Sequence, residues 1–374
     1  MKTIVIFTTY AFSLTNFRGK LIEELIKRSH IVHAIAPDFD PEIRDRLGEL
    51  GATCHDCHFE RAGTNIVSDF KASLHLYSLL KQINPDCMLS YFIKPVIYGT
   101  VCGFFAGVGH RVAMIEGLGS VFADDDNEVS VRKWLRLALV SKMYKIALMM
   151  TVKTVFLNQD DVDFFDSRYI LKASKATLLG GIGVDLKEWV NKAPVQSPIT
   201  FIMTARLLRE KGVVDFANAA RRVKASCSKA RFILLGGLDP NPTSLTFDEV
   251  NGWVDEGIIE WPGHVPVMEW LSVSSVFVLP SYYREGIPRS SQEALAMGLP
   301  IITTDSVGCR ETVVNGVNGY MVPIKNVDIL VEKMLLFVNN PELILEMGKR
   351  SRELAELRFS EDEKIIMQLD ILNC

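Results

Sequence analysis

The sequence predicts an α/β protein of two domains, each built on a doubly wound parallel sheet. The chain has 374 residues, which is enough for two domains that each bury a core of their own. Short apolar segments alternate with longer helical segments in both halves, as is typical of parallel strands joined by right-handed helical crossovers. The sequence contains no internal repeat, and it has no run of about 18 apolar residues that would span a membrane.

The first domain is expected to comprise residues 1–190. Its predicted strands are residues 3–7, 31–36, 52–57, 86–90, 111–115 and 154–157, and helical segments separate them. In sheets of this kind, ligands bind at the carboxyl ends of the strands. The first strand is not followed by G-x-G-x-x-G, which argues against a nicotinamide-dependent enzyme.

The second domain is expected at residues 199–359. A linker is predicted at residues 191–198, which include two prolines and few apolar residues. The predicted strands of this domain are residues 200–204, 232–235, 258–261, 277–279 and 301–304.

The composition favours a protein of a reducing compartment that does not bind nucleic acid. The formal net charge is -4 and the isoelectric point is about 6.0, which gives no general attraction to nucleic acid. The 7 cysteines are odd in number and lack the dense spacing of a disulfide scaffold. The apolar run in MKTIVIFTTY is too short for a signal-peptide core and fits a first buried strand. We therefore expect a cytoplasmic protein.

The most informative stretch is residues 277–300, FVLPSYYREGIPRSSQEALAMGLP. It predicts a buried strand, a loop that carries Glu285 and Gly286, and a short helix. Pro288 is expected at the first helical position and Gly298 at the end of the helix. The carboxylate of Glu285 therefore lies just ahead of a helix N-terminus.

This helix start is suited to a phosphate group. A helix N-terminus presents unpaired amides and the positive end of the helix dipole, which here fall on residues 287–291. Glu293, in the early turns, is placed to accept hydrogen bonds from hydroxyls beside the phosphate, and Glu285 faces what lies beyond. A diphosphate flanked by two carboxylates indicates a nucleotide sugar. The alternative is that both acids are solvated residues of a helix start.

Two cations follow the first strand of the second domain. Arg206 comes directly after the strand, and Lys211 with Gly212 opens the next helix. Two cations at one strand end neutralise a diphosphate, both in the ground state and as its charge grows during bond cleavage. The alternative is ordinary scatter of surface charge. Gly236 and His264 follow the next two strands, although a structural histidine is as plausible as a ligand contact.

Polar residues also follow strands of the first domain. The first loop contains Asn16 and Arg18, and the guanidinium of Arg18 is a candidate for binding a phosphate. A later strand ends in Glu116, Gly117 and Gly119, where the glycines allow a ligand to approach the backbone. A surface arginine and plain turn glycines are the alternatives.

Residues 131–150, VRKWLRLALVSKMYKIALMM, form an apolar and basic segment. Its basic residues do not share one helix face, so it is no clean amphipathic helix. Two interpretations remain open: a core helix with solvated ends, or a surface helix that rests on anionic lipid. The candidates for membrane contact are Arg132, Lys133, Arg136, Lys142 and Lys145.

No metal cofactor is expected. Cys54 and Cys57, with histidines beside them, form half of a possible zinc site, but no second pair follows. The run Asp124, Asp125 and Asp126 is interpreted as an acidic loop and not as a cation site.

The motif E-G-x-P-R-x-x-x-E-A-x-A-x-G-x-P together with R-x4-K-G resembles glycosyltransferase family 4, the retaining enzymes of the GT-B fold. The resemblance implies two Rossmann-like domains that face a central cleft, with the last helix, about residues 360–374, packed on the first domain. It implies transfer from a UDP-sugar without a metal, with Glu285, Arg206 and Lys211 as the catalytic residues. The residues expected to bind the donor are Glu293, Gly286, Ile287, Pro288, Arg289, Ser290, Gly236 and His264.

The first-domain loops resemble those of the subset that acts on polyprenyl-diphosphate-linked saccharides. This implies an undecaprenyl-diphosphate-linked acceptor at the inner face of the cytoplasmic membrane, and a hexose or N-acetylhexosamine donor, with GalNAc preferred over Gal or GlcNAc. The acceptor-side residues are then Asn16, Arg18, Glu116, Gly117 and Gly119. The family's histidine near Glu116 is absent, which leaves the catalytic contribution of this loop open. A nucleotide-sugar 2-epimerase of the same fold and a transferase with a soluble acceptor remain alternatives.

Overall fold

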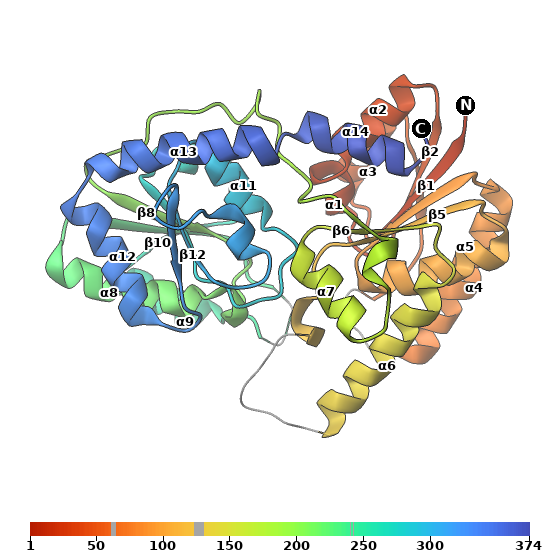
Figure 1. The fold of residues 1–374 in the computed structure, drawn as a ribbon, viewed down its shortest axis with the longest axis horizontal. Coiled ribbons are helices and arrows are strands. Elements are labelled where there is room, and N and C mark those ends of the chain that lie inside the picture. Colours follow the sequence, from red (N-terminus) through yellow and green to blue (C-terminus); the bar gives the residue numbers. More distant parts are fainter. Residues whose placement is uncertain (61–64, 123–130, 240, 242) are drawn as a thin grey trace. The chain divides into compact units, whose positions relative to one another are not determined.

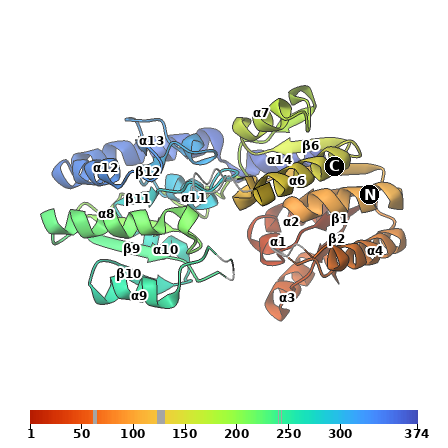
Figure 2. The same cartoon turned by 90° about the horizontal axis from the view of Figure 1, so that it is seen from below.

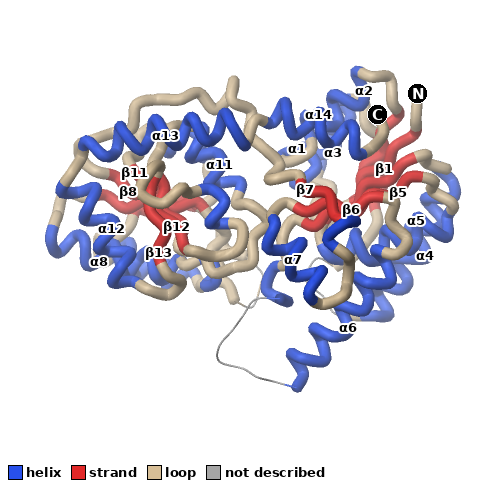
Figure 3. Tube along the Cα trace, in the orientation of Figure 1, coloured by secondary structure: helices blue, strands red, loops and turns tan. Residues whose placement is uncertain are grey.

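The computed structural model describes residues 1–60, 65–122, 131–239, 241 and 243–374. The chain divides into two compact units: Met1–Gly180 together with Glu363–Cys374, and Gly181–Asp362. Each unit contains one parallel sheet with helices around it, as the separate groups of strands in Figure 3 show. The predicted fold class is therefore confirmed. No helix among the described residues is long and apolar enough to cross a membrane.

The first unit has a seven-stranded sheet in the order β3-β2-β1-β4-β5-β6-β7, with every pair parallel. Its strands are β1 (Thr3–Phe7), β2 (Ile31–Ala36), β3 (Thr53–Asp56), β4 (Cys87–Tyr91), β5 (His110–Ile115), β6 (Lys153–Phe156) and β7 (Ala176–Leu178). Its α-helices are α1 (Phe12–Asn16), α2 (Gly19–Lys27), α3 (Pro41–Leu50), α4 (Ile66–Ile83), α5 (Thr100–Ala106), α6 (Val131–Leu148), α7 (Gln159–Ser167) and most of α14 (Glu361–Ile371).

The direction of the crossovers places the helices in two layers. The chain moves one way from β1 to β3 and the other way from β3 to β7, so right-handed connections put the two sets of helices on opposite faces. Helices α2 and α3 lie on one face with α14, and α4, α5 and α6 lie on the other (Figure 1). A π-helical turn, Pro95–Gly99, leads directly into α5.

The second unit has a six-stranded parallel sheet in the order β10-β9-β8-β11-β12-β13. Its strands are β8 (Thr200–Thr204), β9 (Arg231–Leu235), β10 (Glu260–Gly263), β11 (Val276–Leu279), β12 (Ile301–Thr304) and β13 (Gly319–Val322). Its α-helices are α8 (Val213–Ser226), α9 (Phe247–Asp255), α10 (Val267–Leu271), α11 (Arg289–Ala296), α12 (Val327–Asn339) and α13 (Glu342–Arg358). Helices α8 and α12 lie side by side in both views (Figures 1 and 2).

Several local expectations need correction. The first loop contains the short helix α1, and Pro288 is the cap that precedes α11 and not its first residue. Strand β13 was not predicted, because its Asn-Gly start has the composition of a turn. Residues 191–198, expected as a linker, group with the second unit, where the amide of Val195 bonds the carbonyl of Ser274 at 3.1 Å.

Candidate functional site

The polar residues predicted in the second unit gather at the carboxyl edge of its sheet. Arg206 follows β8, Gly236 follows β9 and His264 follows β10, while Glu285 lies in the loop after β11. Because all these strands are parallel, their carboxyl ends meet at the same edge. The side chain of His264 is exposed, and a β-carbon added at Gly237 would lie 3.6 Å from its Cβ.

Lys211 and Glu285 form an ion pair at this edge. Their side chains are only 12% and 10% exposed, so solvent screens the pair little. The hydroxyl of Ser281 also donates to Oε1 of Glu285, at 3.1 Å. The amides of Tyr282 and Tyr283 bond the carbonyl of residue 210, at 2.9 and 3.0 Å, and this holds the Lys211 turn against the Glu285 loop. The sequence placed each residue at a strand end but did not predict that they pair.

Tyr283 lies beside both cations of the site. Its ring centroid is 5.0 Å from Nζ of Lys211 and 5.8 Å from the guanidinium carbon of Arg206. Nη1 of Arg206 also contacts Oδ2 of Asp239, at 3.2 Å. Burial alone would lower the pKa of Arg206, but Tyr283 and Asp239 together raise it above its ordinary value. Sequence reasoning missed Tyr283 and Asp239, although Tyr283 is only two residues before Glu285.

Glycines allow the loops of this edge to pack closely. Gly212 has φ +77°, and a β-carbon there would overlap the carbonyl of Pro280 at the end of β11. Gly308 has φ +76°, and a β-carbon there would overlap the carbonyl of Gly286 and lie 2.8 Å from that of Glu285. Both positions therefore require the absence of a side chain.

The N-terminus of α11 is the predicted phosphate turn, and it has the local structure that this role needs. Gly286, Ile287 and Pro288 lead into the helix, and Arg289 and Ser290 are its first two residues. The hydroxyl of the next residue, Ser291, is fully buried and has no hydrogen-bond partner among the described residues. The turn thus combines the amides of a helix N-terminus with a buried hydroxyl.

Glu293 pairs with a residue of its own helix. Oε1 of Glu293 lies 3.2 Å from Nε of Arg289, whose Nη1 lies 3.8 Å from Oε1 of Glu361. Burial raises the pKa of Glu293 to about 7, against the opposing effect of Arg289. The predicted contact of Glu293 with a ribose stays a prediction.

In the first unit, the structure pairs Arg18 with Glu116. The Arg18 side chain is completely buried, its guanidinium carbon lies 4.6 Å from the centroid of the Tyr91 ring, and Nη2 bonds the carboxylate of Glu116. Glu116 itself is 7% exposed. The alternative of a surface arginine is therefore wrong, and the contact of Arg18 with an acceptor phosphate stays a prediction.

The other acceptor-side residues lie near this pair in the chain. Asn16 is exposed at the end of α1, two residues before Arg18. Gly117 and Gly119 have φ +96° and +62°, so the loop after Glu116 uses backbone conformations that favour glycine.

Helix α6 carries the basic residues proposed for membrane contact. Arg136, Lys142 and Lys145 are exposed, and the side chains of Arg132 and Lys133 lie outside the described part of the structure.

Two groups of residues were considered as metal ligands from the sequence. Asp124, Asp125 and Asp126 also lie outside the described residues. Within the described ranges, no three His, Cys, Asp or Glu side chains are grouped as for a metal ion, and Cys54 and Cys57 are free thiols.

Two Rossmann-like units, one with cations and carboxylates at its ligand edge beside the start of α11, define a glycosyltransferase of the GT-B class. Residues 198–340 match the family model described as glycosyl transferases group 1. The chain is 30% identical over 371 residues to the N,N'-diacetylbacillosaminyl-diphospho-undecaprenol alpha-1,3-N-acetylgalactosaminyltransferase of Campylobacter jejuni, with 95% of this chain and 94% of the relative covered. The chain therefore belongs to this glycosyltransferase family, and it is a hexosyltransferase.

Further comparisons agree. The chain is 25% identical to the UDP-Gal:alpha-D-GlcNAc-diphosphoundecaprenol alpha-1,3-galactosyltransferase of Escherichia coli, over 77% of this chain and 75% of the relative. Among solved structures, sucrose-phosphate synthase from Thermosynechococcus elongatus has a TM-score of 0.82 at 16% identity and covers 99% of this chain and 98% of its own. HepE from Anabaena, in complex with UDP and glucose, has a TM-score of 0.76 at 13% identity with both chains fully covered (100%). These structures support the fold.

Proposed function

We propose that this glycosyltransferase moves a hexose or N-acetylhexosamine, foremost GalNAc, from a UDP-sugar to an undecaprenyl-diphosphate-linked saccharide during assembly of a surface polysaccharide or related glycan. The names of two relatives, from C. jejuni and E. coli, describe transferases that act on saccharides linked to undecaprenol diphosphate. A structural neighbour was solved with UDP and glucose. These likenesses support the donor and acceptor classes.

The observation that carries the proposal is the convergence of opposite charges at one edge of the second unit. Arg206 and Lys211 are within reach of the same ring, Tyr283, and Lys211 contacts Glu285. The start of α11 adds amides that favour an anion. A nucleotide diphosphate needs such donors most when the sugar leaves, because negative charge then grows on the departing oxygen.

In the proposed reaction, the carboxylate of Glu285 orients the sugar. Its Oε1 already accepts bonds from Lys211 and Ser281, so sugar hydroxyls would join or replace these donors. The bond between the anomeric carbon and the diphosphate oxygen breaks, and the acceptor oxygen bonds that carbon on the same face. The acceptor's proton passes to the leaving diphosphate. Configuration is thereby retained, and no metal is required.

We place the acceptor at the first unit and the protein at the inner face of the cytoplasmic membrane. The exposed cations Arg136, Lys142 and Lys145 on α6 support attraction to anionic lipid, at about 1 kcal/mol for each cation near the surface. Flotation with anionic vesicles tests this placement. A protein that stays unbound in low salt would contradict it.

The function is tested by UDP release from UDP-GalNAc, UDP-GlcNAc, UDP-Gal and UDP-Glc, each with and without a membrane lipid extract. We expect release from one donor that depends on the lipid and persists in EDTA. Release without lipid would indicate hydrolysis or an epimerase-like reaction, and loss in EDTA would contradict metal independence. Release from none of the donors would contradict the proposed donor or acceptor class.

A further inference from the structure

The helix layer α4, α5 and α6 exposes an unusual amount of apolar side chain. Helix α4 contributes Val67 and Phe70, which are 65% and 62% exposed, and α6 contributes Trp134 and Leu139, which are 67% and 53% exposed. On the opposite face, α2 and α3 expose no large apolar side chain, and α14 exposes Ile366 and Met367, which are 57% and 36% exposed. A gathering of this kind on one face indicates an interaction site.

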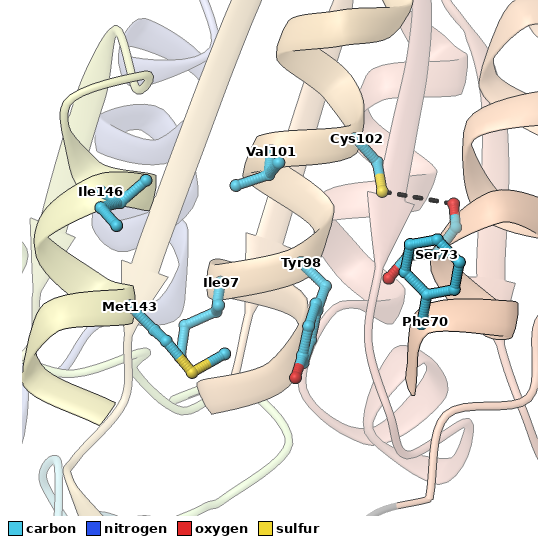
Figure 4. Close-up of a pocket in the computed structure, with 8 residues that line it drawn as sticks. All are labelled: Phe70, Ser73, Ile97, Tyr98, Val101, Cys102, Met143 and Ile146. Carbon is cyan, nitrogen blue, oxygen red and sulfur yellow. Dashed lines mark hydrogen bonds between the residues drawn. The ribbon is translucent and has the colours of Figure 1, made fainter. Parts of the chain in front are cut away.

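A groove of about 340 Å³ runs through this layer. Figure 4 shows Ile97 and Val101 between two walls, with Phe70 on the α4 side and Met143 and Ile146 on the α6 side. The volume is at the lower end of the range of small-molecule sites, which is roughly 300–1,000 Å³. The lining is almost entirely hydrocarbon, so the groove suits a chain without polar groups.

One end of the groove is polar. Asp69, which precedes Phe70, pairs with Lys94 at 2.6 Å, and burial together with this nearby carboxylate raises the pKa of Tyr98 to about 12. Phe70 lies near the start of α4, and Lys94 lies just beyond the carboxyl end of β4. In a parallel sheet, helix starts and strand carboxyl ends lie at the ligand edge. The groove therefore extends from the ligand edge along the helices.

Three residues of the groove walls have exposed cations as sequence neighbours. Lys71 follows Phe70, Lys142 precedes Met143, and Lys145 precedes Ile146. A ligand that combines a long hydrocarbon with an anionic headgroup complements this surface. A prenyl diphosphate has both features.

We propose that the groove between α4 and α6 holds the isoprenoid chain of the lipid-linked acceptor and so selects acceptors by their hydrocarbon. The inference rests on the proposed acceptor class and adds a binding site to it. The diphosphate then lies at the polar end, and the first isoprene units lie along Ile97 and Val101.

The test compares two pairs of substitutions on the same helices. Phe70→Ser with Ile146→Ser changes the groove walls at side chains that are 62% and 45% exposed. Val67→Ser with Leu139→Ser changes side chains of similar exposure, 65% and 53%, that do not line the groove. All four positions are exposed, so both variants are expected to fold. Val101→Phe, which fills the groove, is a third variant.

The probes are geranylgeranyl diphosphate and inorganic diphosphate, measured by binding to the full chain. We expect the groove pair and Val101→Phe to weaken geranylgeranyl diphosphate binding at least about tenfold, with the control pair within about twofold of wild type. Inorganic diphosphate should bind all variants alike. Equal effects of both pairs, or no effect of either, would overturn the proposal.

Two further arms separate this inference from the proposed function. The first arm measures binding to vesicles of anionic lipid without prenyl lipid. If the variant Phe70→Ser, Ile146→Ser loses vesicle binding while its geranylgeranyl diphosphate binding is unchanged, the occupant is a membrane acyl chain and the proposal is wrong. The second arm measures lipid-dependent sugar transfer. Equal transfer by the groove variant and the control variant would also refute the role of the groove, but it would leave the proposed function intact. A selective loss of geranylgeranyl diphosphate binding supports the groove even if no tested donor is turned over.

Discussion

Gly308→Ala offers a direct test of how the Glu285 loop is held. The residue has φ +76°, and an added β-carbon would overlap the carbonyl oxygen of Gly286 and lie 2.8 Å from that of Glu285. Ordinary contact begins at 3.4 Å, so relieving the contact with Glu285 alone takes a shift of about 0.6 Å, and the overlap with Gly286 takes a larger one. Because a displacement of about 1 Å costs up to roughly 100-fold in rate, we expect a loss of turnover of ten- to 100-fold.

Gly316→Ala is the matched control. Gly316 has φ +77°, but a β-carbon there meets nothing within 4 Å. Both substitutions place an L side chain at positive φ, which costs at least about 1–2 kcal/mol and lowers the melting temperature by a few degrees in a domain of this size. Only Gly308→Ala also displaces the loop. Turnover of a UDP-sugar and thermal unfolding are measured on both variants, and equal turnover would refute the proposed role of the loop position.

Three other substitutions test the charged residues. Lys211→Ala should lower turnover about 10²–10³-fold with the fold intact by circular dichroism. The control Lys187→Ala changes a side chain that is 82% exposed and should leave turnover unchanged. Similar rates for the two variants would contradict the role of Lys211. Burial raises the pKa of Glu293 to about 7, so the folded protein binds more protons than the unfolded chain between about pH 4.5 and 7. The free energy of unfolding therefore falls as the pH rises through this range, by at most about 3 kcal/mol. Urea unfolding at several pH values should show a smaller fall in the free energy of unfolding for Glu293→Gln than for wild type. The same pH dependence in both proteins would count against the raised pKa. Arg18→Met should lower the free energy of unfolding by about 3–5 kcal/mol, because Glu116 is left buried without its cation. The double variant Arg18→Met, Glu116→Gln should recover most of this loss. Equal stability of the single and double variants would argue against the ion pair.

The alternation of strands and helices was predictable because it depends on local composition. The apolar runs that form β1, β8 and β11 are short, rich in branched and aromatic residues, and bounded by turn residues. Strand β13 was not predicted from the sequence because it begins at Gly319, in an Asn-Gly sequence that is typical of a turn. The sheet requires glycine here, because a β-carbon on this backbone, at φ +153°, would overlap the backbone of Ile301 in the neighbouring strand.

The candidate site was predictable only in part. Topology brings strand ends together, so Arg206, Lys211 and Glu285 were expected at one edge. The partners of these residues depend on side-chain geometry: Lys211 and Glu285 are 74 residues apart. Arg18 shows the limit most clearly. The sequence indicates an arginine at a loop end, but only the packing of Tyr91 and Glu116 around it shows that it is buried.

The return of α14 to the first unit affects the order in which the protein is completed during synthesis. Ile365, Leu369 and Leu372 are buried, and Lys364 bonds the carbonyl of Leu179 at 2.7 Å. The second unit is one continuous stretch, so it has all its residues as soon as Asp362 leaves the ribosome. The first unit, although translated earlier, must wait for the final dozen residues before its apolar surface is covered. A nascent chain stalled before Glu363 is therefore expected to expose its amino-terminal half to proteases and chaperones.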